Sequence, residues 1–209
     1  MKKYQCMITG VGGQGSMMLG QFLKIAALKR KDLRVMGSES RGAAQREGSV
    51  DATVRYAEMG EGEEPDERRS VHSVSIPTGE ADLFISMETG EILQALKYIS
   101  SKTTVILNNY RILPRAAITQ GLNYPELDDV IGVLKEMTSD IHVIDANKLS
   151  KDNFGDFTMV SVIFLGAAVA SGKLPVSRQN VEDVINEVHR MPDRAMKAFN
   201  LGLNAMKQE

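Results

Sequence analysis

Short apolar runs alternate with stretches of helical periodicity over the first two thirds of the chain. The apolar runs, which read as strands, lie at 4–9, 33–36, 82–87, 103–107 and 141–145. Apolar residues recur at helical spacing between them, at 22–27, 91–99 and 125–137. A strand–helix rhythm of this kind predicts a parallel sheet with helices packed on its faces.

Residues 49–56 depart from this rhythm. Every second position from Val50 to Tyr56 is apolar and the positions between are polar, a period of two that is typical of a half-exposed antiparallel strand. We expect its partner at 71–76, where apolar residues also alternate. The stretch between them, 58–69, is charged and poor in apolar groups, which predicts a solvated loop.

The last quarter of the chain is helical in pattern. Residues 159–170 are apolar nearly all round, which predicts a buried helix. Ser177 is suited to cap the next helix, and Pro192 is suited to the first turn of the last one.

Together these patterns predict an α/β fold. We expect a Rossmann-like, open, mostly parallel sheet with flanking helices, an antiparallel strand pair and a helical C-terminal part. The length of 209 residues fits one domain, with the sheet core in 1–148 and the helical part in 149–209.

A glycine-rich turn, Gly10-Val11-Gly12-Gly13-Gln14-Gly15, joins the first strand to the first helix. Gly10 allows a tight turn, Gly12 lets backbone approach a ligand, and Gly15 permits close packing of helix on strand. The free amides and the dipole at the start of the helix favour an anion, often a pyrophosphate. Five candidate ligand-binding residues follow from this turn: Gly10, Gly12, Gly13, Gln14 and Gly15.

The polar segment after the second strand, 37–48, indicates which class of ligand the glycine turn would bind. Glu39 lies where an NAD enzyme places the acid that holds the ribose hydroxyls. Arg41 and Arg46 follow it, and a guanidinium prefers phosphate or carboxylate. The segment therefore favours a phosphate-rich ligand or an anionic partner surface. Three of its residues complete the candidate site: Ser40, Arg41 and Gly42.

Two further functions stay open on these residues alone. One is a self-contained NAD(P)-dependent dehydrogenase in which Glu39 or Arg41 recognises the ribose of the cofactor. The other is a nucleotide-sensing module without catalytic activity.

Charge and composition argue against several kinds of partner and location. The formal net charge of −2 argues against a broad nucleic-acid-binding face. The longest apolar run is too short to span a bilayer and no secretory signal opens the chain, so we expect a cytoplasmic protein.

Cys6 is the only cysteine and the three histidines lie far apart, which argues against zinc or iron–sulfur sites. Neither a phosphate-loop signature nor a G-x-S-x-G elbow occurs. We therefore expect no metal and no catalytic residue here, as in a subunit whose chemistry lies in a partner.

Several segments together resemble a known family. The glycine turn and Ser40-Arg41-Gly42 are similar to the gamma domain of 2-oxoacid:ferredoxin oxidoreductases. Residues 76–82, 87–93 and 108–114 resemble the beta subunits of indolepyruvate:ferredoxin oxidoreductases. The likeness covers nearly the whole chain.

The resemblance implies a subunit of an enzyme that oxidatively decarboxylates a 2-oxoacid, such as indolepyruvate or another aryl pyruvate. Such an enzyme passes the acyl group to coenzyme A and reduces ferredoxin. It implies that thiamine diphosphate and iron–sulfur clusters reside on a larger partner subunit, and that this chain holds no covalent cofactor. Coenzyme A is expected at or near this subunit, close to Gly12, Gly13, Gln14, Gly15 and Arg41. Neither nucleic acid nor membrane is an expected partner.

Overall fold

The computed structural model describes residues 1–42, 48–60, 71–121 and 123–207. A six-stranded sheet with the order β2-β3-β1-β4-β5-β6 forms its centre. The strands are β1 (Lys2–Val11), β2 (Leu33–Arg41), β3 (Ser49–Glu58), β4 (Leu83–Ser86), β5 (Thr104–Asn108) and β6 (Ile141–Ile144). The helices are α1 (Ser16–Leu28), α2 (Arg115–Gln120), α3 (Leu127–Lys135), α4 (Ala146–Phe154), α5 (Val160–Ala170), α6 (Arg178–Val188) and α7 (Pro192–Ala205).

The sheet is mostly parallel, as the sequence pattern predicts. β1, β4, β5 and β6 pair in parallel, whereas β3 runs antiparallel to both of its neighbours, β1 and β2. β2 therefore points the same way as β1. The carboxyl ends of all five strands other than β3 consequently meet at one rim of the sheet.

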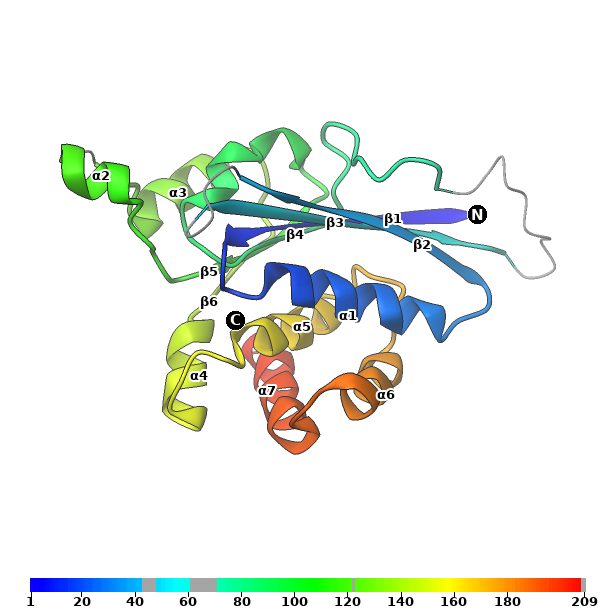
Figure 1. Cartoon of the computed structure of the whole chain (residues 1–209). Coiled ribbons are helices and arrows are strands. Elements are labelled where there is room, and N and C mark those ends of the chain that lie inside the picture. The colour runs from blue at the N-terminus through cyan, green and yellow to red at the C-terminus, as the bar shows by residue number, and fades with distance from the viewer. Residues whose placement is uncertain (43–47, 61–70, 122, 208–209) are drawn as a thin grey trace.

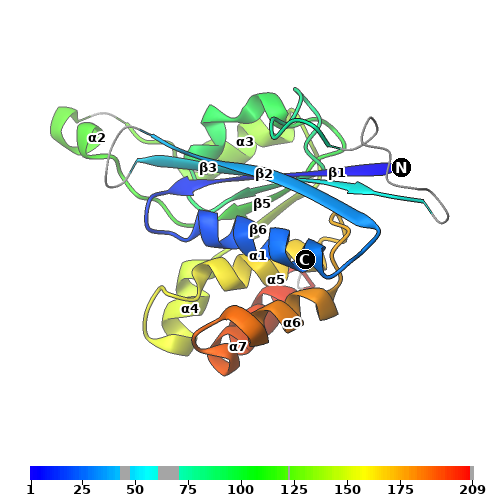
Figure 2. The same ribbon diagram turned by 45° about the vertical axis from the view of Figure 1, so that its right-hand side comes forward.

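Helices cover both faces of the sheet. α1, α5, α6 and α7 form the thicker layer, below the sheet in Figure 1, and α3 lies on the other face. Figure 2 shows the same layers from a second side, with α4 beside α5 and α7. Each layer encloses its own group of buried apolar side chains. The predicted α/β class is thus confirmed.

The C-terminal helices follow their sequence signals closely. The helix predicted at 159–170 is α5, which is buried along most of its length between α1 and α7. Ser177 caps α6: its Oγ accepts from the amide of Asn180 at 3.2 Å, while the Asn180 side chain accepts from the Ser177 amide at 3.1 Å. Pro192 begins α7.

The predicted partner of the antiparallel strand is wrong. Residues 71–76 form no strand, and β3 pairs with β1 and β2 instead. Segment 71–76 lies over the polar face of β3. The Arg55 guanidinium donates to the carbonyls of Ser73 and Ser75, at 2.6 and 2.8 Å, and the Thr53 hydroxyl donates to Val74 at 2.8 Å. Side chains of β3 thus satisfy the carbonyls that a ladder would have used.

Two other expectations need correction, and two helices had no prediction. Residues 37–41, predicted as loop, continue β2, because β3 offers them a pairing edge up to Arg41. Residues 91–99 form two short 3-10 turns rather than one helix. α2 and α4 carry no clear apolar periodicity and were not predicted; α4 begins at a cap, where Asp145 accepts from the Lys148 amide at 2.9 Å.

Candidate functional site

The rim between β1 and β4 is the point where the chain reverses its direction of travel across the sheet. After β1 the chain crosses through α1 on one face to reach β2, whereas the turns after β4 pack on the opposite face. In open α/β sheets, ligands bind in the crevice that such a reversal leaves at the carboxyl ends of the strands. The glycine turn occupies this position.

A backbone hydrogen bond and two glycines with positive φ shape the glycine turn. The Gly12 amide donates to the Gly48 carbonyl at 2.9 Å. Gly13 and Gly15 have φ of +100° and +90°, a region that side chains rarely adopt. A Cβ on Gly15 would lie 2.9 Å from the Cβ of Ser161 in α5. Gly15 therefore permits close packing as expected, but against helix α5 rather than against a strand.

Gly10 and Gln14 fit together beneath the turn. A Cβ on Gly10 would lie 2.5 Å from the Ser16 Oγ and 2.9 Å from the Gln14 Oε1. The Gln14 Oε1 accepts from the Val11 amide at 2.8 Å, and its Nε2 donates to the Met87 carbonyl at 2.9 Å. The first glycine of the motif thus makes room for the carboxamide of Gln14.

The N-terminus of α1 faces this turn without a side-chain cap. Gly15 is the capping residue, and no acidic side chain lies in the first turn of the helix. The positive end of the helix dipole is therefore not offset by a carboxylate of α1, which favours an anion.

Arg41 lies beside this helix start. Arg41 and Gly10 are both paired with Val50, from opposite sides of β3, so their backbones are about 10 Å apart, two strand spacings. The exposed Arg41 side chain reaches α1, where its Nε lies 3.1 Å from the Met17 Sδ. The structure thus brings the predicted arginine and the predicted glycine turn to one edge.

The other candidate residues of this segment differ in their setting. Ser40 and Gly42 are exposed, and the Gly42 amide is used in a 2.8 Å bond to the Ser49 carbonyl. Glu39 forms an ion pair with Lys24 of α1 at 3.1 Å, so the acid expected at a ribose is already engaged. Arg46 lies outside the described residues, as does most of the charged stretch 58–69.

The buried carboxylate of Glu88 organises the rim. The sequence points to this residue only as part of segment 87–93, which resembles a known family. Glu88 is fully buried. Its Oε2 accepts from the Tyr124 hydroxyl at 2.8 Å and from the amides of Gly90 and Glu91 at 2.7 and 2.9 Å. Its Oε1 accepts from the Ile112 amide at 3.0 Å. Burial, followed by the hydrogen bond to Glu88, raises the pKa of Tyr124. Glu88 therefore ties together the segments that follow β4 and β5.

Asn108 extends this network to β6. Its Nδ2 donates to the Met87 carbonyl at 2.7 Å and to the Asn147 Oδ1 at 2.8 Å. Its Oδ1 accepts from the Ala146 amide at 3.2 Å. The rim between β1 and β6 is thus a continuous set of buried hydrogen bonds, which holds the glycine turn on a rigid base.

Neither an accessible thiol nor a metal cluster is found among the described residues. Cys6 is fully buried as predicted, and burial raises the pKa of its thiol, so it is an inert core residue. Within the described ranges, no three His, Cys, Asp or Glu side chains gather as a metal site would need. None of the helices in the described part is both long and apolar enough to cross a bilayer.

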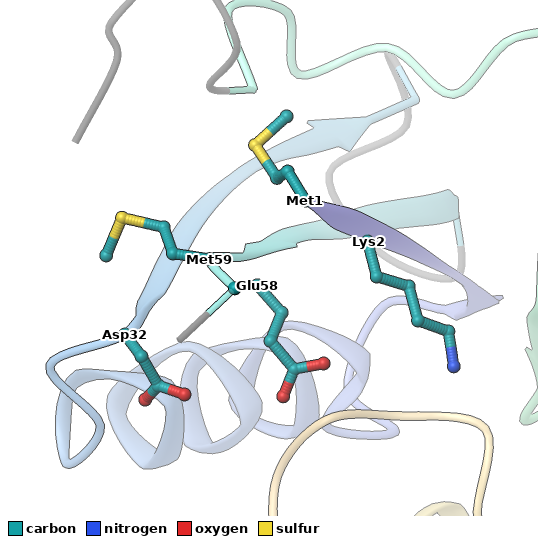
Figure 3. A pocket seen from close by; sticks show the side chains of 6 residues that line it. Met1, Lys2, Asp32, Glu58 and Met59 are labelled. Atoms are coloured by element: carbon teal, nitrogen blue, oxygen red, sulfur yellow. The ribbon is translucent and has the colours of Figure 1, made fainter. Parts of the chain in front are cut away.

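A separate hollow lies at the opposite end of the sheet, where Met1, Lys2, Asp32, Glu58 and Met59 line it (Figure 3). Its carboxylates are already engaged. Arg30 binds both Asp32 and Glu58, so we assign no ligand to this hollow.

Comparison with known proteins finds similar sequences along the whole chain. Residues 5–205 match the family described as pyruvate ferredoxin/flavodoxin oxidoreductase. The chain is 31% identical to indolepyruvate oxidoreductase subunit IorB of Archaeoglobus fulgidus, over 94% of this chain and 92% of that protein. It is 32% identical to the subunit of the same name from Pyrococcus horikoshii, over 100% and 98%.

Two solved structures share the fold at low sequence identity. One is a keto/oxoacid ferredoxin oxidoreductase gamma subunit from Geobacter sulfurreducens, with a TM-score of 0.64, 18% identity and 99% of each chain covered. The other is a 2-oxoglutarate:ferredoxin oxidoreductase from Magnetococcus marinus, described with 2-oxoglutarate, coenzyme A and succinyl-CoA bound. Its TM-score is 0.67 at 16% identity, and the match covers 100% of this chain but 32% of that one.

Proposed function

The chain belongs to the pyruvate ferredoxin/flavodoxin oxidoreductase family, and from that premise we propose that it serves an indolepyruvate-type 2-oxoacid:ferredoxin oxidoreductase as its subunit without redox cofactors. The observation that carries this proposal is the full-length likeness to subunits named for indolepyruvate oxidoreductase, at 31% and 32% identity. The reaction would convert an aryl pyruvate and coenzyme A to an acyl-CoA and CO2, and the two electrons released would reduce ferredoxin. A cytoplasmic location is part of the proposal.

A larger partner subunit would supply thiamine diphosphate and the iron–sulfur clusters. The whole chain contains one cysteine, whereas a cluster is held by several, usually four. This division of labour is tested by copurification of the native protein. A larger partner that carries iron, sulfide and thiamine diphosphate is expected, and aryl pyruvate oxidation should require both proteins.

We further propose that the glycine turn and Arg41 hold phosphate groups of coenzyme A. Two features support this. The uncapped start of α1 presents backbone amides and the positive end of a dipole, and the exposed Arg41 guanidinium lies over the same helix turn. Coenzyme A when bound supplies the thiol that takes the acyl group; the residues of this chain bind and orient its anionic end.

Arg41→Ala tests the assignment. Loss of one charge-assisted hydrogen bond should raise the KM for coenzyme A by roughly 10- to 100-fold, with little change in kcat. The matched control is Arg34→Ala, because Arg34 is an exposed arginine of the same strand that binds only the Lys31 carbonyl in the described structure. Equal KM values in the two variants would remove Arg41 from the site.

The NAD(P) dehydrogenase alternative is less favoured by the structure. Its best ribose ligand, Glu39 of β2, forms an ion pair with Lys24 of α1. Calorimetry with NAD and NADP provides the direct check, because micromolar binding together with hydride transfer by this chain alone would restore that alternative.

A further inference from the structure

Each polar atom of the Gln14 carboxamide makes a hydrogen bond inside the protein. Its oxygen accepts from the Val11 amide at 2.8 Å, and its nitrogen donates to the Met87 carbonyl at 2.9 Å. The Gln14 backbone amide also donates to the Val11 carbonyl at 3.1 Å. Side chain and main chain of one residue thus close the turn on both sides of Val11.

The surroundings of this side chain are built to hold it. Gly10 lacks the Cβ that would lie 2.9 Å from the Gln14 Oε1. The Met87 carbonyl receives a second donor, the Asn108 Nδ2, at 2.7 Å. Through this shared carbonyl, Gln14 connects the turn after β1 with the ends of β4 and β5.

We propose that Gln14 is a positioning residue, which shapes the glycine turn so that the amides at the start of α1 face the ligand. Val11 and Met87 bind the two polar atoms of the carboxamide, so the protein fixes its orientation without a ligand. This differs from the sequence-based expectation that Gln14 is a ligand contact. The proposal rests on the proposed coenzyme A site for its kinetic consequence, but not for its effect on the turn.

The two roles of Gln14 differ in the protein without ligand. A positioning residue alters the turn whether or not an anion is bound, whereas a ligand contact alters only the bound state. The hydrogen-exchange rates of the backbone amides of residues 10–15, measured in the ligand-free complex, distinguish the two roles. The Val11 amide is the main probe because it donates to the Gln14 side chain.

Gln14→Leu is the main variant, because leucine is of similar size and makes no hydrogen bond. We expect exchange at Val11 to become about tenfold faster without ligand, the effect of losing one hydrogen bond. We also expect the KM for coenzyme A to rise about tenfold with kcat nearly unchanged, because the misplaced amides bind the anion less well. If Gln14→Leu fails to assemble, Gln14→Met is the second variant, because methionine is as long and flexible as glutamine and makes neither of the two hydrogen bonds. The same changes in exchange at Val11 and in the KM for coenzyme A are expected.

Gln5→Leu is the matched control. Gln5 lies in β1, is 6% exposed and, like Gln14, donates its Nε2 to a carbonyl, that of Glu80, at 2.9 Å. It lies toward the other end of the strand from the turn. This variant should lose stability without any change in exchange at residues 10–15 or in the KM for coenzyme A.

Each other outcome has a definite meaning. A raised KM with unchanged exchange in ligand-free Gln14→Leu would make Gln14 a ligand contact and overturn the proposal. Unchanged exchange together with an unchanged KM would overturn it as well. Faster exchange at the turn in an enzyme whose wild type shows no dependence on coenzyme A would refute the proposed ligand but leave the positioning role standing.

Discussion

The contact between α5 and α7 depends on a glycine in each helix. A Cβ on Gly202 would collide with the Ile163 carbonyl oxygen and lie 2.8 Å from its carbonyl carbon and 3.0 Å from the Ala167 nitrogen. A Cβ on Gly166 would collide in the same way with the Phe199 carbonyl. Because the obstacles are backbone atoms, no rotamer change can relieve them, and Gly202→Ala must push the two helices apart.

Two opposing effects decide the size of the change. Alanine is favoured over glycine in a helix interior by about 1 kcal/mol. Overpacking a close contact costs typically about 1–3 kcal/mol and occasionally more, and a rigid backbone obstacle belongs at the upper end. We therefore expect Gly202→Ala to lower the free energy of unfolding by about 2 kcal/mol, or Tm by roughly 4–8 °C for a chain of this length.

Gly132→Ala is the control, measured with Gly202→Ala by urea unfolding and calorimetry. Gly132 lies inside α3, is exposed, and has no atom within 4 Å of the position of a Cβ. Only the propensity effect operates there, so this substitution should stabilise the protein by up to about 1 kcal/mol. If Gly202→Ala were as stable as the wild type or more so, the close helix contact and the reasoning from it would be refuted.

Two further changes test the hydrogen bonds of the fold. Tyr124→Phe removes one donor from the buried Glu88 carboxylate and should cost about 1.5–3 kcal/mol in urea unfolding; a change below about 0.5 kcal/mol would show that this bond contributes little. Asp156 accepts from the Thr158 hydroxyl and amide at 2.6 and 2.9 Å and from Arg194 at 2.6 Å, and these contacts lower its pKa to about 2. Its folded pKa is depressed, so its contribution is present above about pH 4 and is lost as the pH falls through 2. Melting curves of wild type and Asp156→Asn should therefore differ near neutral pH and converge between pH 4 and 2; a constant difference would contradict the assignment.

Much of the architecture could be predicted because its causes are local. The strand–helix rhythm, the apolar α5 and the capping by Ser177 each follow from a period or a residue within a few positions. The glycine turn could be found for the same reason, since positive φ at Gly13 and Gly15 demands glycine. That the whole chain forms one domain stays a prediction.

The failures concern segments whose conformation is set by distant partners. Segment 71–76 alternates like a strand, yet Arg55 and Thr53 bind its carbonyls from the face of β3. Residues 37–41 are polar like a loop, yet the edge of β3 extends them as strand. Local pattern does not reveal which of several neighbours will satisfy a backbone group.

The sequence by itself determined the class of fold, the place of the glycine turn and the presence of an arginine near the end of the second strand, because each depends on residue type and spacing. Only the tertiary structure decided which groups these residues contact. The Gln14 side chain ends at the carbonyl of Met87, 73 positions away, and Glu88 meets Tyr124 across 36 positions. Buried polar groups must find partners wherever the folded chain brings them, and that geometry, not the motif, assigns their roles.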